Sequence, residues 1–230
     1  MGYTLAVERS TPQASWALYR DATLVAARPL AGTQLRAPSW VAEIMAGLVE
    51  LGVAPGALER VIVGTGPGSF SGIRAAIAAL QGLALPSGRP VLGLASAAAL
   101  GRKMALATAC ATVAVVGDAR RERLWCAVYR LAAEGRLTLA SSGEQPGHTS
   151  DDFLLPTWAT LSASIPGDAW VISPDWERLA ARFLAHAAVG CACHAAAAVP
   201  TAEDLGALYF SDPSAARHDP APIYLHPAVA

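Results

Sequence analysis

The chain has 230 residues, of which 53% are hydrophobic and only 15% are charged, and its 17 Lys and Arg nearly balance 18 Asp and Glu to a formal net charge of −1. A protein built mainly to grip nucleic acid through phosphate contacts needs a clear excess of cations, so that class is excluded. The high apolar content and low charge also exclude a largely disordered chain.

Membrane and secretory classes are excluded next. The longest strongly apolar uncharged stretch, residues 104–117, is shorter than the roughly 20 residues that cross a bilayer as a helix. No basic segment precedes an apolar run at the N-terminus, so we expect no signal peptide. The four cysteines lack the spacing of a disulfide framework. We therefore expect a protein of the cytoplasm.

Alternating apolar runs predict the elements of the first half in the order βββαβαβα. In chain order they are strands at 3–8, 14–19 and 23–28, a helix over 39–51, a strand at 61–64, a helix over 70–85, a strand at 91–94 and a helix over 96–107. A three-strand meander followed by alternating helices and strands is typical of a mixed sheet covered by helices, as in ribonuclease-H-like domains.

A second set of elements begins near residue 112. It contains strands at 112–117 and 122–131 about a charged turn, and a helix over 201–211 with a capping-box-like start. Repetition of the first unit is one interpretation. We expect an N-terminal lobe over 1–108, which the helix and tail at 201–230 could complete, and a smaller lobe over 109–200.

The strongest local feature is a strand that runs through glycines into a helix, VIVGTGPGSFSGIRAAIAALQGLAL. Such a turn places backbone N–H groups at a helix N-terminus and suits either an anion or a closely packed backbone. No Lys-Ser/Thr pair follows, as a Walker loop requires, and Ser71 stands where a dinucleotide-binding turn has its third glycine. The pattern fits a tight strand-to-helix turn as well as a ligand loop.

Several segments together resemble the TsaB family, also called YeaZ, which is an accessory family in the threonylcarbamoyladenosine modification of tRNA. GPGSFSGIR resembles that family's GPGSFTGLR signature, and its signature residues here are Gly66, Pro67, Gly68, Ser69, Phe70, Ser71, Gly72 and Arg74. Residues 118–131, 199–210 and 222–227 resemble the family's Asp-Ala-Arg turn and strand, its late Pro-x-Ala helix and its Pro-x-Tyr-Leu-Arg ending. The match is weakest at about 140–198.

The resemblance implies an α/β fold of two ribonuclease-H-like lobes of the actin-like ATPase superfamily, with mixed sheets flanked by helices. It also implies a non-catalytic scaffold that pairs with a homologue of TsaD, of the glycoprotease family, for threonylcarbamoyl transfer to adenosine 37 of tRNA. The ATPase TsaE would join the pair, and tRNA would be bound only indirectly. No cofactor is expected on this chain, because ATP or ADP would be held mainly by TsaD and TsaE. The surface that binds TsaD could also pair two copies of this chain.

The residues themselves also argue against an active site. No histidine precedes His148, so the first lobe lacks an HxxxH or HExxH metal pair. The first turn reads Glu8-Arg9-Ser10-Thr11, without the glycines that hold phosphate in active members of the superfamily. It also departs from the Asp-Thr-Ser-Thr turn usual in the TsaB family, which alters the cleft end of the first lobe.

Two groups of residues are candidates for function. The first is the partner interface, which we expect on the helices at 39–51 and 70–85. Each of these helices has apolar residues on more than one face, as a helix that covers a sheet and docks a partner would need. Its predicted members are Trp40, Ile44, Ile73 and Ile77. The second is a cleft group made of Glu8, Arg9, Thr11, Asp118 and Arg120. For the last two, a solvated charged hairpin is the alternative interpretation.

Two further hypotheses remain open from the sequence. Glu8 and Asp118 could direct a metal in an ATP-dependent kinase or hydrolase, whereas an M22-type peptidase is less favoured because its ligands are absent. Cys191, Cys193 and His194 are soft ligands without an evident fourth, and their alternation with small residues suits buried cysteines in a strand. We expect no metal site.

Overall fold

The computed structural model describes residues 2–30, 39–140, 152–186, 192–193 and 198–225. Within these ranges no helix combines the length and the hydropathy that a membrane span requires. The chain forms two compact units. Unit 1 comprises Met1–Ser96 and Pro200–Pro222, and unit 2 comprises Ala97–Val199 and Ile223–Ala230.

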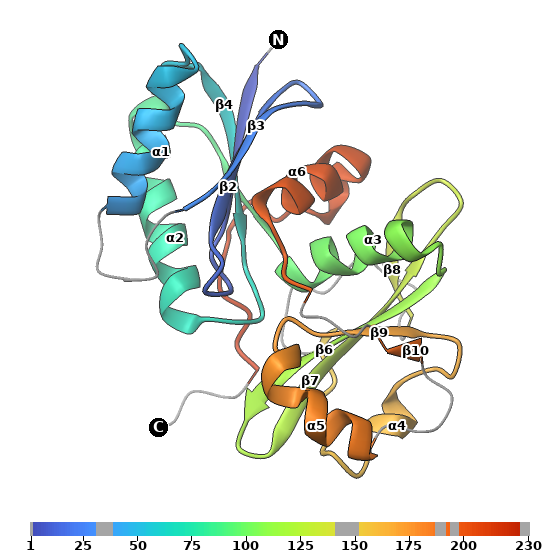
Figure 1. Cartoon of the computed structure of the whole chain (residues 1–230). Coiled ribbons are helices and arrows are strands. Elements are labelled where there is room, and N and C mark those ends of the chain that lie inside the picture. The colour runs from blue at the N-terminus through green and yellow to red at the C-terminus, as the bar shows by residue number, and fades with distance from the viewer. Residues whose placement is uncertain (1, 31–38, 141–151, 187–191, 194–197, 226–230) are drawn as a thin grey trace. The chain divides into compact units, whose positions relative to one another are not determined.

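Unit 1 is built on a five-stranded mixed sheet in the order β3-β2-β1-β4-β5 (Figure 1). Its first three strands form an antiparallel meander, while β4 runs parallel to β1 and β5 runs parallel to β4. The strands are β1 (Tyr3–Glu8), β2 (Ser15–Arg20), β3 (Thr23–Pro29), β4 (Leu58–Gly64) and β5 (Val91–Leu94). The central strands β1 and β4 are almost continuously buried, because helices cover both faces of the sheet.

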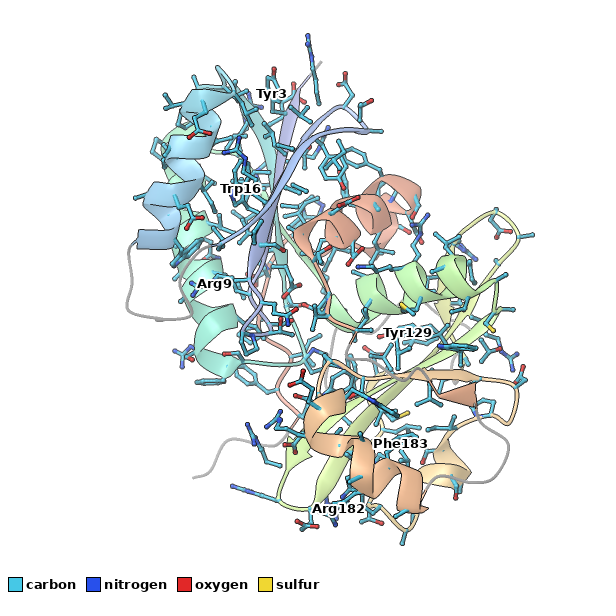
Figure 2. All side chains as sticks on the ribbon, in the orientation of Figure 1. Tyr3, Arg9, Trp16, Tyr129, Arg182 and Phe183 are labelled. Carbon is cyan, nitrogen blue, oxygen red and sulfur yellow. The ribbon has the colours of Figure 1, made fainter. Side chains whose placement is uncertain are left out.

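Two helices cover one face of this sheet and a third covers the other (Figure 1). The first face carries α1 (Ser39–Glu50) and α2 (Phe70–Ala84), and the second carries α6 (Ala202–Ser211). Short 3-10 turns are η1 (Pro55–Ala57), η2 (Leu85–Ser87) and η4 (Pro213–Ala215). The core under α1 and α2 is anchored by Trp16, which is 1% exposed and is labelled in Figure 2. On the α6 face, the Tyr19 hydroxyl donates to the Glu203 carbonyl over 2.8 Å.

Unit 2 repeats the same sheet topology with the order β10-β9-β6-β7-β8. Its strands are β6 (Thr112–Arg120), β7 (Arg123–Leu131), β8 (Leu137–Leu139), β9 (Trp170–Ile172) and β10 (Ala192–Cys193), and its helices are α3 (Ser96–Thr108), α4 (Leu161–Ser164) and α5 (Trp176–His186). The α4 and α5 side of the sheet is packed by Trp158, Trp176 and Phe183. On α3, Gly101 lies so close to Tyr129 that a Cβ there would be 2.7 Å from the ring.

The predicted fold class is confirmed, as are the order of elements in the first half and the repetition of one unit. The unit boundary differs from the expected one. The sequence placed it at residue 108, whereas α3 groups with unit 2 from Ala97 onward. The physical reason is the packing of α3 on the β7 side chain Tyr129.

The four residues predicted for the partner interface lie in the core of unit 1 and not on its exposed surface. Trp40 and Ile77 are 7% exposed, and Ile44 and Ile73 are 1% exposed, all within the cluster that joins α1 and α2 to the sheet. Both helices carry apolar residues on two faces, and the pattern alone does not say which face the sheet takes.

A pair of substitutions on neighbouring residues tests this assignment of faces. Ile77→Glu buries a charge in the core and is expected to lower the free energy of unfolding by more than about 3 kcal/mol. Ala78→Glu places the same side chain on the exposed face of the same helix and should change stability by less than about 0.5 kcal/mol. Urea denaturation followed by circular dichroism measures both, and equal losses would contradict the assigned faces.

Candidate functional site

The loop that carries the glycine signature, residues 66–72, is packed against the turn between β1 and β2. We call Glu8, Arg9 and Ser10 the 8–10 turn. The Ser10 carbonyl accepts a hydrogen bond from the Ser69 amide over 2.7 Å. A Cβ on Gly68 would lie 2.1 Å from that same carbonyl oxygen, and a Cβ on Gly72 would lie 2.5 Å from the carbonyl oxygen of Arg9. The two glycines therefore admit a neighbouring backbone.

Several N–H groups of this loop are already bonded within unit 1. The Gly66 amide donates to Ser96 Oγ over 3.1 Å, and Ser69 Oγ caps α2 by accepting from the Gly72 amide over 3.3 Å. Together with the Ser69 amide, these are three amides of the loop that are no longer free to bind an anion. Of the two interpretations left open by the sequence, the geometry favours a tight strand-to-helix turn over a ligand loop.

Glu8 ends β1 as a buried hydrogen-bond acceptor. Its side chain is 0% exposed, and its Oε1 accepts from the Ser10 amide over 2.5 Å. A Cβ on Gly64 would lie 2.1 Å from Oε2, so the carboxyl group is also closely packed against β4. Burial raises the pKa of Glu8, while hydrogen bonding from Ser10 and Ser96 opposes that shift. A metal ion would reach this carboxyl group only after the packing around it opened.

Arg9 and Thr11 occupy different environments. The Arg9 side chain is 6% exposed, and its guanidinium lies 4.5 Å from the centroid of the Trp40 ring on α1. Figure 2 labels Arg9 on the α1 and α2 side of the sheet. Burial lowers the pKa of this guanidinium. Thr11 is only partly buried, at the open end of the turn. Of the predicted cleft residues in unit 1, Glu8 and Arg9 therefore contribute to packing.

Asp118 and Arg120 belong to the β6–β7 hairpin of unit 2. Asp118 Oδ2 lies 3.2 Å from Arg120 and 3.3 Å from Arg178 of α5, so its charge is compensated by two guanidinium groups. The Asp118 amide also donates to Asp175 Oδ2 over 2.9 Å. The hairpin reverses through a tip with positive φ angles of 65°, 52° and 58° at Arg120, Arg121 and Glu122. These contacts describe a solvated hairpin tied to α5 by ion pairs.

The cysteine motif falls largely outside the described residues. Cys191 and His194 are not described, and Cys193 is placed only as the last residue of β10. Over the part of the chain that the structure does describe, no three His, Cys, Asp or Glu side chains gather in a way that could hold a metal ion.

The outward face of α1 and α2 belongs to the two helices that the sequence predicts to bind a partner, but its exposed residues are not among the four that were predicted. Val49 is 73% exposed, Phe70 is 53% exposed and Leu85, directly after α2, is 79% exposed. Small exposed residues lie on the same helices, namely Ala42, Ala46, Ala75, Ala78 and Gly82. The Arg74 guanidinium lies 5.0 Å from the centroid of the Phe70 ring. The available signal was a second apolar stripe at 70, 78, 82 and 85, spaced like the buried stripe at 73, 76, 77, 80 and 84.

The two repeated sheets define a protein with the ribonuclease-H-like, actin-like fold. Residues 34–145 match the family model of TsaD, described as tRNA N6-adenosine threonylcarbamoyltransferase. Two solved structures from Pseudomonas aeruginosa, one described as YeaZ and one as an uncharacterized protein with similarity to peptidase YeaZ, match at TM-scores of 0.78 and 0.79. Both are 25% identical, over 98% of this chain and 100% of theirs. The chain is therefore similar to YeaZ over nearly its whole length and to the TsaD family model over residues 34–145.

Curated relatives are matched over a shorter region. Uncharacterized proteins of Mycobacterium bovis and Mycobacterium tuberculosis are each 30% identical over 127 residues, which is 54% of this chain and 58% of those proteins. The chain thus spans little more than half the length of these relatives.

Gly68→Ala tests the backbone contact between the loop and the turn. The added methyl group has to displace the Ser10 carbonyl, and we expect a loss of about 2 kcal/mol in the free energy of unfolding. Gly82→Ala on α2 is the control, because no atom lies within 4 Å of its new Cβ. There the better helix propensity of alanine should raise stability by up to about 1 kcal/mol. Urea denaturation measures both, and a Gly68→Ala protein as stable as the control would contradict the packing.

The raised pKa of Glu8 predicts how stability depends on pH. A carboxyl group that holds its proton more tightly in the folded protein contributes stability below its ordinary pKa of 4.5, and this contribution is lost as the pH rises through the folded value. The nearby Asp204 charge acts in the same direction as burial.

Glu8→Gln removes this titration and still offers an oxygen to the Ser10 amide. The stability of the wild type relative to Glu8→Gln should therefore fall as the pH rises above the ordinary pKa of 4.5, as measured by urea denaturation at a series of pH values. A difference that stays constant or grows with pH would contradict a raised pKa.

Proposed function

We propose that this chain is a non-catalytic subunit that pairs with a TsaD-type tRNA N6-adenosine threonylcarbamoyltransferase through the outward face of α1 and α2. In this role it supports threonylcarbamoyl transfer to adenosine 37 of tRNA. The observation that carries the proposal is the exposure of three large apolar side chains on this helix layer: Val49 near the end of α1, Phe70 at the start of α2 and Leu85 directly after α2. Large apolar side chains exposed on neighbouring elements are typical of a surface that another protein covers.

The chemistry of this face suits packing of helix against helix. Between Phe70 and Leu85 the sequence has a single charged residue, Arg74. Alanines and a glycine separate the larger side chains, which lets a partner helix approach closely. Burial of such apolar area contributes about 25 cal/mol per Å² to association before its entropic costs are subtracted. Arg74, held on the Phe70 ring, gives the face one cation to pair with an acidic group on the partner.

The family match supports a TsaD-type partner. The matched region, residues 34–145, contains both α1 and α2, so a TsaD protein has elements related to this helix pair. Related surfaces can pair about an approximate two-fold axis. Two copies of this chain could associate in the same way when the partner is absent, and a homodimer would then compete with the heterodimer.

Catalysis is assigned to the partner and not to this chain. Glu8 is enclosed by β4 and the 8–10 turn, and Asp118 is engaged by Arg120 and Arg178. Neither carboxylate is presented as an open metal ligand, which disfavours the ATP-dependent alternative. In the proposed complex ATP or ADP is held by TsaD and by the ATPase TsaE. With a net charge of −1, the chain contacts tRNA only through its partners.

Ala78→Glu tests the docking face without disturbing the core. A charge buried without a partner at an interface should weaken binding to the TsaD protein of the same organism at least about a hundredfold, or about 2.7 kcal/mol. Isothermal titration calorimetry measures the dissociation constant, and an assay of tRNA threonylcarbamoylation measures activity of the mixture. Leu106→Glu on α3, where Leu106 is 53% exposed, is the matched control and should bind as the wild type does.

The proposal fails if Ala78→Glu binds the TsaD protein normally, or if the wild type does not bind it. ATP turnover by the isolated wild-type chain, lost on substitution of Glu8 or Asp118, would instead favour the ATP-dependent enzyme.

A further inference from the structure

The 8–10 turn contacts both helices of the docking face. Arg9 stacks its guanidinium on Trp40, the second residue of α1. Ser10 accepts the amide hydrogen of Ser69, which is the N-cap of α2. The residues of the turn are at most 6% exposed, so these contacts lie within the protein interior. One short turn thus holds the N-terminal ends of both helices.

The turn itself is held between the end of β1 and the glycine loop. Glu8 Oε1 accepts the Ser10 amide over 2.5 Å, and Glu8 is anchored at the end of the central strand β1. On the other side, Gly68 and Gly72 leave only enough space for the carbonyl groups of Ser10 and Arg9. A shift of the turn therefore moves Ser69 and Trp40 with it, because protein interiors are close-packed and transmit such displacements.

The contact of the turn with α1 and its contact with α2 respond differently to substitution. The bond from Ser69 to Ser10 joins backbone to backbone and does not depend on the identity of either side chain. The contact on Trp40 depends on a planar cation, and stacking of a desolvated guanidinium on an indole ring is a specific interaction that other long side chains do not reproduce. Residue 9 can therefore change the position of α1 while α2 stays in place.

We propose that the 8–10 turn sets the affinity of the docking face for its partner by fixing the relative position of α1 and α2: Arg9 positions α1 through Trp40, and Glu8 positions α2 through Ser10 and Ser69. This inference rests on the proposed function, in which the outward face of the same two helices binds a TsaD-type partner. The turn does not touch the partner. Its residues are positioning residues, and their effect reaches the partner through the spacing of the two helices.

The test compares binding with stability in four variants of the full chain. Arg9→Met removes the stacked cation and keeps an unbranched side chain, and Glu8→Ala removes the acceptor for the Ser10 amide. Glu8→Gln keeps that acceptor. Leu208→Ala on α6 truncates a residue that is 0% exposed on the opposite face of the sheet, so it lowers stability without touching the turn, α1 or α2. Calorimetry with the TsaD protein gives the dissociation constant, and thermal denaturation gives Tm.

We expect Arg9→Met and Glu8→Ala to raise the dissociation constant about tenfold, and Glu8→Gln to stay within about twofold of the wild type. Leu208→Ala should bind normally, although we expect its Tm to fall at least as far as that of Arg9→Met and Glu8→Ala. Hydrogen exchange of the isolated variants gives a second measurement. Faster exchange should be confined to amides near residues 40–44 in Arg9→Met and near residues 69–73 in Glu8→Ala.

Two results would overturn the inference while leaving the proposed function intact. In the first, Arg9→Met and Glu8→Ala bind the partner as tightly as the wild type. In the second, Leu208→Ala loses as much affinity per degree of lost Tm as Arg9→Met and Glu8→Ala do. The turn would then affect binding only through general stability. If the wild type itself does not bind the TsaD protein, the proposed function fails, and the role of the turn in binding fails with it. Exchange that rises evenly over unit 1 would also count against a local positioning role.

Discussion

A single backbone contact joins the end of β1 to the start of α2 in unit 1. The Ser10 carbonyl lies where any side chain at Gly68 would have to be, and it accepts the amide of Ser69 at the start of α2. This contact fixes where α2 leaves the sheet, and it requires glycine in a loop whose sequence suggests a phosphate site. The amides of Gly66, Ser69 and Gly72, which could have bound an anion, instead donate hydrogen bonds within unit 1. The loop therefore serves as a structural connection between β4 and α2.

The contact between the loop and the 8–10 turn fixes the orientation of α2. One apolar stripe of the helix is therefore buried and the other is exposed. The inner stripe packs on the sheet with residues such as Ile73 and Leu80, which are each 1% exposed. The outer stripe includes Phe70 and Leu85, which are 53% and 79% exposed. Exposed apolar side chains favour association, because water is released when they are covered. The same helix can therefore serve the core and an interface only because its rotation is fixed.

Periodicity was sufficient to predict the meander and the alternation of helices and strands in the first half, whereas it left the repeat open and only the family resemblance implied two lobes. It could not separate the two stripes of α2, since both have helical spacing and only the sheet decides which is buried. The burial of Glu8 was also beyond prediction, because a carboxylate at a strand end is ordinarily solvated. Likewise, the stacking of Arg9 on Trp40 joins residues 31 positions apart, and such contacts leave no local pattern.

The assignment of helices to units shows a further limit of local reasoning. Although α3 follows β5 in the chain, it groups with unit 2, and α6 follows β10 but groups with unit 1. The sheet of unit 1 is thus completed by a helix from a distant part of the sequence, and unit 2 begins with the helix that follows β5. For unit 1 that helix is held by specific bonds: the Ala202 amide donates to Ser15 Oγ over 2.9 Å, and Tyr19 donates to the Glu203 carbonyl. In unit 1, α6 covers the second face of this sheet, and α1 and α2 form the layer that covers the first face. The surface they present is set by the sheet beneath them and by the 8–10 turn.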